Sequence, residues 1–192
     1  MTTIRPFKMT DLLSFNSVNL DPLTETYNIG FYLDYYSRWP EYFTAASSPN
    51  NKLMAYSMGK CEGVNEDSPE INESGTKDES KKYGLWHGHV TCLTVSPEFR
   101  RLGLGNLLMN ELESVSSKIY NCWFVDLFVR KSNWKAIGMY EKFGYVGFRK
   151  VLGYYSGEED AWDMRKKLDR DCGGHSVVPL QRPIQPDEIE WG

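Results

Sequence analysis

Two adjacent arginines stand one residue before a Gly-Leu-Gly turn in the segment VSPEFRRLGLGNLLMN, residues 95–110. An apolar strand pattern precedes this turn, and a helical pattern follows it. The first backbone N–H groups of a helix lack partners within the helix, and the helix dipole places partial positive charge there. Glycines let a diphosphate approach the backbone, and arginines add charge-assisted hydrogen bonds. The segment therefore predicts an anion-binding corner, although Gly103 and Gly105 alone would also suit a tight turn with solvated arginines.

Other nucleotide-binding patterns fit this corner poorly. A Rossmann fingerprint needs a third glycine or an alanine where Leu108 stands, and a P-loop needs Gly-Lys-Ser/Thr, which does not follow. The spacing Arg-x-x-Gly-x-Gly, formed by Arg100, Gly103 and Gly105, resembles the acyl-coenzyme A signature of the GNAT superfamily of N-acetyltransferases. The resemblance implies that the backbone of residues 101–106 holds the pyrophosphate of acetyl-CoA.

A second pattern lies downstream of the corner. Asn133, Ala136, Tyr140, Gly144 and Tyr145 fit N-x-x-A-x-x-x-Y-x-x-x-G-[FY], which resembles a helix of the same superfamily. Asn133 and Tyr140 are two helical turns apart, so they share one face about 10 Å long. Tyr140 taken alone would suit a core aromatic. The two signatures, however, occur in the expected order, each on the expected kind of element.

The superfamily resemblance implies acetyl-CoA as cosubstrate and direct attack of a neutral amine on its thioester, without a covalent enzyme intermediate. We hypothesise that Tyr140 donates to the departing thiolate, that Asn133 holds the cofactor and that backbone N–H groups near residues 93–95 stabilise the oxyanion. Cys92 is expected to serve packing. The implied cofactor-binding residues are Leu93, Val95, Arg100, Arg101, Leu102, Gly103, Leu104, Gly105, Asn106, Asn133 and Tyr140.

The resemblance extends to one family within this superfamily. The segments LDPLTETYNIGFYLDYY, WPEYF, LMAYSMGK, WHGHVTCLTVSPEFRRLGLG, FVDLFVRKSNWKAIGMYEKFGY and GYYS are similar to the catalytic subunits of NatB, over residues 1–168 and parts of the tail. This similarity implies acetylation of the α-amine of nascent chains that begin Met-Asp, Met-Glu, Met-Asn or Met-Gln. It also implies a heterodimer with a large helical auxiliary subunit, at the ribosome.

The NatB resemblance implies that the peptide is bound by Glu25, Tyr27, His89, Thr91, Tyr154 and Tyr155. His89 and Tyr140 are the two catalytic candidates. His89 can also donate to a carboxylate or to a side-chain amide, which suits a substrate whose second residue is Asp, Glu, Asn or Gln. Tyr154 and Tyr155 supply rigid walls and hydroxyls for a peptide backbone. Without the resemblance, His89 would suit a structural role, Glu25 a solvated loop and the tyrosines an ordinary strand. Whether His89, Glu25 or water accepts the amine proton stays open.

Metal binding is an alternative for the sequence WHGH, in which His87 and His89 share one face of a strand. No further ligands cluster with them in the sequence, because His175 lies in the tail and the four cysteines are scattered. We therefore expect no metal site.

Two other functions stay open. A GNAT enzyme that acetylates lysine or small amines would need a stronger base, because a lysine amine has a pKa of about 10.4. A non-catalytic module that binds CoA or a partner would be expected to have lost Arg100, Asn133 or Tyr140, which are all present.

Composition limits the remaining classes. The 192 residues are 41% hydrophobic and 14% aromatic, which indicates a folded domain. With 22 Lys and Arg against 26 Asp and Glu, the net charge of -4 disfavours nucleic-acid reading and an anionic membrane surface. The N-terminal residues have no apolar leader pattern, and the cysteines have no CxxC spacing. We expect a reducing, cytoplasmic setting.

Apolar periodicity predicts the elements that position these residues. Strands are expected at 3–6, 42–46, 52–61, 85–95, 122–129, 145–152 and 162–168. Helices are expected at 10–17, 31–39, 104–117 and 132–144. This order predicts an α/β fold with a mixed sheet and helices on both faces. The superfamily resemblance implies the GNAT fold, with a central mixed, mostly antiparallel sheet of about seven strands flanked by about four helices.

The chain is expected to form one acetyltransferase domain, residues 1–168, followed by a tail, residues 169–192. Residues 62–82, EGVNEDSPEINESGTKDESKK, contain almost no apolar side chains, which predicts a mobile polar loop insertion. The tail is expected to lie over the surface or to fray.

Overall fold

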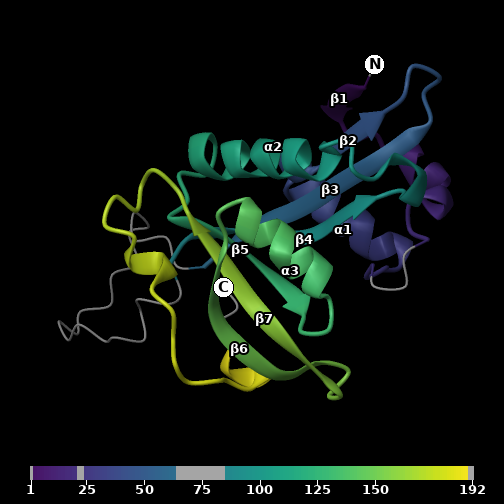
Figure 1. The fold of residues 1–192 in the computed structure, drawn as a ribbon. Helices are drawn as coiled ribbons and strands as arrows, with labels where there is room; N and C mark the ends of the chain where they lie inside the picture. The colour runs from purple at the N-terminus through teal and green to yellow at the C-terminus, as the bar shows by residue number, and fades with distance from the viewer. Residues whose placement is uncertain (1, 21–23, 64–84, 190–192) are drawn as a thin grey trace. The chain divides into compact units, whose positions relative to one another are not determined.

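The computed structural model describes residues 2–20, 24–63 and 85–189 (Figure 1). Its seven strands follow the order β1-β2-β3-β4-β5-β7-β6. The chain divides into two compact units, one of Met1–Lys60 with Val90–Ile119 and one of Cys61–His89 with Tyr120–Gly192. Strands β3 (Leu53–Glu62) and β4 (His87–Val95) contribute residues to both units.

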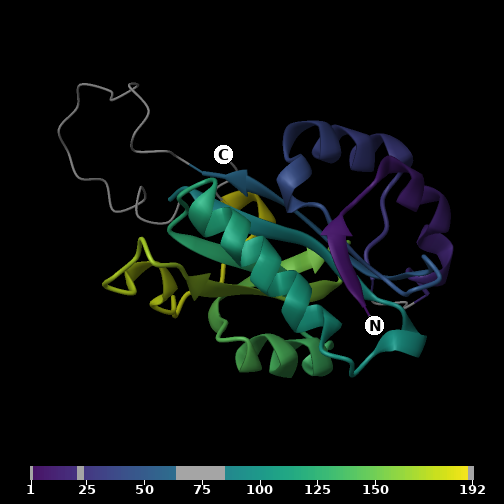
Figure 2. The ribbon, with the colours of Figure 1, turned by 90° about the horizontal axis from the view of Figure 1, so that it is seen from above.

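In the first unit, β1 (Thr3–Pro6) pairs antiparallel with β2 (Thr44–Ser47), and β2 pairs antiparallel with β3. Two α-helices belong to this unit, α1 (Ile29–Arg38) and α2 (Leu104–Lys118). The unit also contains the 3-10 helices η1 (Met9–Ser17), η2 (Pro40–Tyr42) and η4 (Pro97–Phe99). Figure 2 shows α1 and α2 on opposite sides of β2 and β3, as the predicted helices on both faces require.

Each face of these strands has its own apolar core, because successive strand residues point to opposite sides. Phe7, Phe15, Tyr32, Tyr56 and Met58 are buried together on the side of α1. On the side of α2, the buried residues are Ala46, Met54, Ala55, Leu104 and Leu108, with Leu93 and Val95 packed against them. This core on the side of α2, the α2 core, therefore positions the end of β4 and the start of α2. The stretch of residues 100–105, which contains the turn between them, is the anion-binding corner predicted from the sequence and is called the glycine corner below.

The helix predicted at residues 10–17 is wrong in type, because the segment forms the 3-10 helix η1. Asp11 explains the tight start. Its carboxylate accepts the Lys8 N–H at 2.8 Å and two hydrogen bonds from the Arg5 guanidinium at 2.7 and 2.8 Å. Side-chain bonds of this kind compete with a regular helical start.

In the second unit, β5 (Phe124–Arg130), β6 (Val146–Tyr155) and β7 (Glu159–Lys167) form antiparallel pairs, with β7 in the centre. Helix α3 (Trp134–Lys142) lies over β5 and β7 (Figure 1). The hairpin β6–β7 is longer than predicted, since residues 153–155 and 159–161, expected in the connection, extend the strands. The remaining turn is 156–158, and Gly153, at φ 60, lies where the register shifts.

The tail packs against β6, so the alternative that it frays is wrong for residues 169–189. It contains the 3-10 helices η5 (His175–Val177) and η6 (Pro186–Glu188). The Leu152 N–H donates to the Ile184 carbonyl at 2.9 Å, and the Ile184 N–H donates to the Lys150 carbonyl at 3.0 Å. Ile184 and Ile189 are buried. These two apolar residues explain the docking, because burying them offsets the entropy of ordering the segment.

Most of the polar loop predicted at residues 62–82 lies outside the described residues. Glu62 was wrongly assigned to it, since this residue ends β3 and is 7% exposed.

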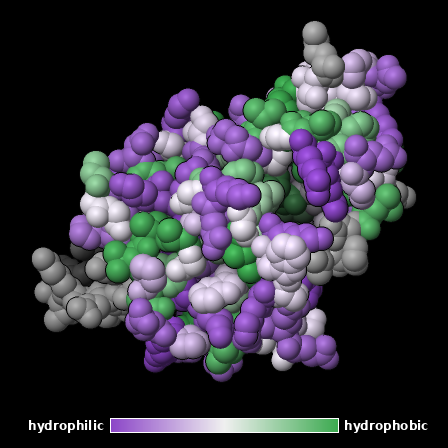
Figure 3. All heavy atoms as spheres, in the orientation of Figure 1, coloured by the Kyte–Doolittle hydropathy of each residue, from purple (hydrophilic) through white to green (hydrophobic). Residues whose placement is uncertain are grey.

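No helix among the described residues is long and apolar enough to cross a membrane. On the face drawn in Figure 3, hydrophilic and hydrophobic residues are interspersed.

Candidate active site

The glycine corner has the geometry that an anion site needs. Strand β4 ends at Val95, and α2 begins at Leu104 after Gly103, which has a left-handed φ of 78°. No side chain caps the helix start, and the first turn contains no acidic residue. The first N–H groups of α2 are therefore left without a side-chain acceptor, which is the arrangement that binds phosphate oxygens.

The residues around this corner fit a diphosphate. A Cβ built on Gly103 would meet no heavy atom within 4 Å, so a ligand has room against the backbone. Arg100 and Arg101 are exposed, and the Arg100 Nε donates to the Val95 carbonyl at 3.3 Å. Leu102 is 59% exposed, whereas Leu104 is buried under α2. Gly105 is half-buried and Asn106 is exposed in the first turn.

The downstream signature lies on α3, as predicted. Asn133 caps the helix, since its side-chain oxygen accepts the Ala136 N–H at 3.2 Å. This bond uses the carbonyl of the side chain and leaves its NH₂ group to serve as the donor to a cofactor. Tyr140 is buried, 9% exposed, with its ring 5.9 Å from that of Tyr145.

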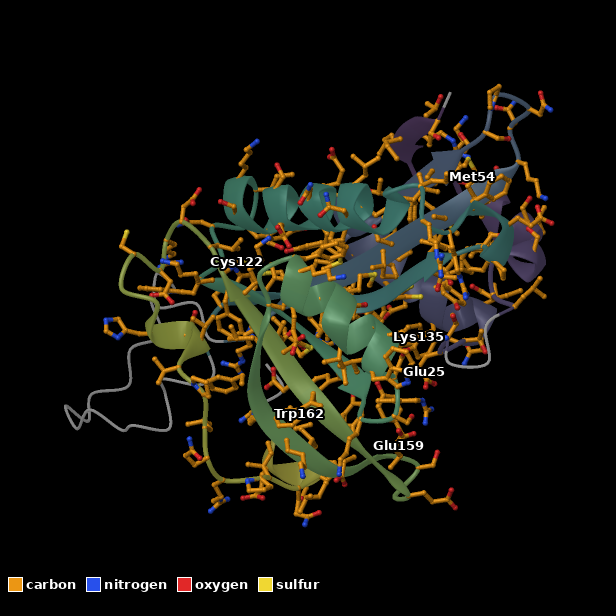
Figure 4. The ribbon with its side chains drawn as sticks, in the orientation of Figure 1. Glu25, Met54, Cys122, Lys135, Glu159 and Trp162 are labelled. Carbon is orange, nitrogen blue, oxygen red and sulfur yellow. The ribbon has the colours of Figure 1, made fainter. Side chains whose placement is uncertain are left out.

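The predicted peptide residues of the first unit lie on a loop and on β4. Glu25 and Tyr27 are partly exposed in the irregular segment before α1, where Figure 4 labels Glu25. Tyr27 is held by its ring stacking on Phe31 at 4.1 Å and by its N–H donating to the Tyr32 hydroxyl at 3.2 Å. The Thr91 hydroxyl is buried and finds no hydrogen-bond partner among the described residues. Such a group suits a ligand that completes its hydrogen bonding.

The tyrosine pair of the second unit is rigid. The Tyr154 ring stacks on Phe128 at 4.7 Å, and the Tyr155 hydroxyl donates to the Phe128 carbonyl at 3.2 Å. The Arg130 guanidinium lies 4.0 Å from the centre of the Tyr155 ring. Glu159, labelled at the hairpin in Figure 4, accepts from Arg130 at 3.1 Å and from the Ser132 N–H at 2.9 Å. These contacts orient both tyrosine rings.

His89 belongs to a buried polar cluster of Glu62, His87, His89 and Asp126. This cluster was not predicted from the sequence. The His89 Nδ1 lies 2.8 Å from the Asp126 Oδ1. The His87 Nε2 lies 3.5 Å from Asp126 and 3.8 Å from Glu62. All four side chains are less than 10% exposed. Sequence reasoning missed Asp126 and Glu62, although a carboxylate within the apolar run CWFVDLFV was a signal, because buried aspartates are almost always paired.

Asp126 is ionised in this cluster. Burial acts to raise the pKa of Asp126, but the charges of His87 and His89, the hydrogen bond from His89 and the charge of Arg165 outweigh it. The result is a pKa below the ordinary value of an aspartate. The cluster therefore favours the anionic form of Asp126 next to the His89 ring.

Neither metal binding nor a cysteine nucleophile finds support in the described part of the chain. No group of three or more His, Cys, Asp or Glu side chains there is arranged to hold a metal ion. Cys92 is 6% exposed beside Tyr56 and Thr94, and burial raises the pKa of its thiol, which disfavours the reactive thiolate.

Comparison with known sequences identifies similar proteins. Residues 12–145 match the Acetyltransferase (GNAT) family. The chain is 56% identical over 191 residues to the N-terminal acetyltransferase B complex catalytic subunit NAA20 of Arabidopsis thaliana, and the match covers 100% of this chain and 99% of that protein.

Solved structures agree with this similarity. The crystal structure of Chaetomium thermophilum Naa20 in complex with a bisubstrate analogue superposes with a TM-score of 0.81 at 38% identity, covering 96% of this chain and 97% of that one. A chain of the NatB acetyltransferase complex bound to CoA and MES gives a TM-score of 0.71 at 39% identity, covering 86% of this chain and 99% of that one. The predicted fold is thereby confirmed.

Proposed function

Because the chain belongs to the GNAT acetyltransferases, and within them to the family of NatB catalytic subunits, we propose that it acetylates protein N-termini that begin Met-Asp, Met-Glu, Met-Asn or Met-Gln. Acetyl-CoA, when bound, supplies the acetyl group as a thioester. The observation that carries this proposal is the match along the whole chain to the Arabidopsis protein.

The glycine corner and α3 would bind the cosubstrate. The first N–H groups of α2, with Arg100 and Arg101, neutralise a diphosphate, and Gly103 leaves room for it at the backbone. The NH₂ group of Asn133 donates to the pantetheine arm. The remaining predicted contacts come from Leu93, Val95, Leu102, Leu104, Gly105 and Asn106.

The peptide would be held by Glu25, Tyr27, His89, Thr91, Tyr154 and Tyr155. Orientation of the two substrates supplies most of the catalysis, because a free α-amine has a pKa of about 7.7–8.0 and is substantially neutral near pH 7.5. The protein has two further tasks. Backbone N–H groups near residues 93–95 donate to the acetyl oxygen as negative charge develops there, and the Tyr140 hydroxyl donates to the leaving sulfur.

Assembly and location are part of the same proposal. The names of the similar proteins support a complex with the auxiliary subunit of NatB. We further propose action on nascent chains at the ribosome, in the cytoplasm, by an acetyltransferase domain of residues 1–168. The docked part of the tail, residues 169–189, supports that domain through β6.

A peptide assay with acetyl-CoA tests this function. Peptides that begin Met-Asp, Met-Glu, Met-Asn and Ser-Glu, and a peptide with an internal lysine, are offered to the chain with and without the auxiliary subunit. Preference for the first three is expected. Preference for the internal lysine would indicate a lysine acetyltransferase, and binding of acetyl-CoA without any CoA release would indicate a non-catalytic module.

One substitution tests the chemistry. Tyr140→Phe is expected to lower kcat about 100-fold, the scale reported for removing one proton donor, with little change in the affinity for acetyl-CoA. Full kcat in this variant would remove Tyr140 from the reaction.

A further inference from the structure

We propose that Asp126 is a positioning residue that fixes the ring proton of His89 on Nδ1 and leaves Nε2 to bind the side chain of the second substrate residue. A carboxylate side chain then requires the imidazolium form of His89, whereas an amide side chain binds either form. This inference rests on the proposed function, since it concerns the selectivity of the same site.

The geometry of the pair carries the assignment. Asp126 Oδ1 lies 2.8 Å from His89 Nδ1, and both side chains are buried, with Asp126 4% and His89 7% exposed. An ionised carboxylate only accepts hydrogen bonds, so Nδ1 must carry the hydrogen. The nitrogen left for a ligand is Nε2. It is an acceptor when the ring is neutral and a donor when the ring is charged.

The His89 ring lies near Phe128, the residue that contacts both Tyr154 and Tyr155. The ring centres of His89 and Phe128 are 5.6 Å apart. Phe128 in turn stacks on Tyr154 and accepts, through its carbonyl, the hydroxyl of Tyr155. Successive contacts through His89 and Phe128 therefore connect the buried Asp126 to the two tyrosines proposed to enclose the peptide.

The surroundings of the pair define its charge. The ionisable groups next to the pair are Glu62 on β3, His87 on β4 and Arg165 on β7, and Arg165 in turn contacts Asp163 on β7, which binds Arg149 on β6. Glu62 lies 3.8 Å from the His89 Nδ1, and Arg149 binds Asp163 at 2.9 Å. Arg165 is the register partner of Asp126 and also contacts Asp163 at 3.3 Å.

All five of these carboxylate and guanidinium side chains are buried. His87 uses its Nδ1 on the Leu85 carbonyl at 2.6 Å. The Nε2 of His89, the ring nitrogen that does not face Asp126, is the nitrogen assigned to the substrate.

The consequence is a selectivity that depends on pH. A Met-Asp peptide presents only acceptors and only the charged ring donates from Nε2, so the kcat/KM of this peptide relative to that of a Met-Asn peptide should fall as the pH rises. The amide of Met-Asn supplies a donor for the neutral ring and an acceptor for the charged one. Both peptides share the same methionine α-amine, so the ratio of their kcat/KM values cancels the titration of the amine.

Nitrogen NMR of the full chain, labelled with ¹⁵N-histidine, tests the tautomer without any substrate. The sequence contains three histidines, and the signals of His89 are those lost in His89→Gln. Neutral His89 is expected to be protonated on Nδ1, and to shift toward Nε2 protonation in Asp126→Asn, because an asparagine NH₂ can donate to Nδ1. An Nε2-protonated ring in the unsubstituted chain would overturn the assignment.

Kinetics with the auxiliary subunit present test the selectivity. In the unsubstituted enzyme, the Met-Asp to Met-Asn ratio of kcat/KM should fall with rising pH, approaching about tenfold per pH unit as expected for one proton. In Asp126→Asn the ratio should be flat, because a neutral ring protonated on Nε2 donates at every pH. Glu62→Gln is the matched control, since it removes a carboxylate of the same cluster that is 3.8 Å from Nδ1, beyond hydrogen-bonding distance, and it should keep the fall.

The outcomes separate this inference from the proposed function. A flat ratio in the unsubstituted enzyme, or an unchanged fall in a folded Asp126→Asn that still binds acetyl-CoA, would overturn the role of Asp126. Failure to acetylate either peptide would instead refute the proposed function, and the NMR result would still decide which nitrogen carries the proton.

Discussion

Gly103 offers the sharpest test of the glycine corner, because it combines a left-handed backbone with empty space. Its φ is 78°, and an added Cβ would meet no heavy atom within 4 Å. Gly103→Ala should therefore cost only backbone strain, about 1–2 kcal/mol. Loss of unfolded-chain entropy offsets about 0.4–1 kcal/mol of this. The net destabilisation is about 1 kcal/mol, which corresponds to a fall in Tm of about 2–4 °C for a chain of this length.

Gly138, in α3, is the matched control. It also has open space around a built Cβ, but its φ is not positive. Gly138→Ala should raise stability by about 0.5–1 kcal/mol, because alanine favours a helix interior over glycine. The two substitutions add the same methyl group and should shift Tm in opposite directions.

Binding of acetyl-CoA separates the corner from a simple turn. The methyl group of Gly103→Ala would occupy the space assigned to the diphosphate, so acetyl-CoA should bind about tenfold more weakly or worse, since one charged hydrogen bond is worth about 1.5–3 kcal/mol. Isothermal titration calorimetry, with Gly138→Ala as reference, measures this loss. Unchanged affinity in a folded Gly103→Ala protein would refute the assignment of these backbone amides to the cofactor.

Three further predictions concern stability. Leu108→Ala removes a fully buried side chain of the α2 core and should cost about 2.7–5 kcal/mol in urea unfolding; a cost below about 1 kcal/mol would contradict the packing described. Asp171→Ala removes the acceptor for the N–H groups of His175 and Ser176, so limited proteolysis should cut the tail faster, and an unchanged rate would refute this anchoring. The pKa of Asp126 is lowered in the folded state, so its stabilisation is complete above the unfolded value of about 3.9 and is lost as the pH falls below it. Thermal unfolding between pH 6 and 3 should consequently show a smaller acid-induced loss in Asp126→Asn than in the unsubstituted chain, and equal losses would count against the ionised pair.

Local signals in the sequence predicted the elements that carry the proposed cofactor residues. The glycine spacing, the helical period after it and the capping asparagine at 133 are all set within one strand–turn–helix or one helix. Interactions of this kind depend on residues close in sequence, so their patterns are readable from the chain alone. The same holds for β5, whose apolar run indicated a covered strand.

Contacts between distant segments were not predictable in this way. The cluster around Asp126 joins residues from β3, β4 and β5, which no local pattern connects. The docking of Ile184 beside Val151 likewise depends on an apolar cluster whose other residues, such as Ala161, are distant in the sequence. The 3-10 form of η1 results from the bonds of Asp11 to Arg5 and Lys8, which override the helical pattern of its apolar residues.

The docked tail has a consequence for the solubility of the protein. β6 is the last strand in the order of the sheet, and the outer groups of such a strand would otherwise be free to recruit the strand of another chain. The tail occupies the Leu152 N–H and the Lys150 carbonyl. A chain shortened to residue 168 would keep every motif of the cofactor site, yet it would expose a ready template for intermolecular β-pairing and should aggregate.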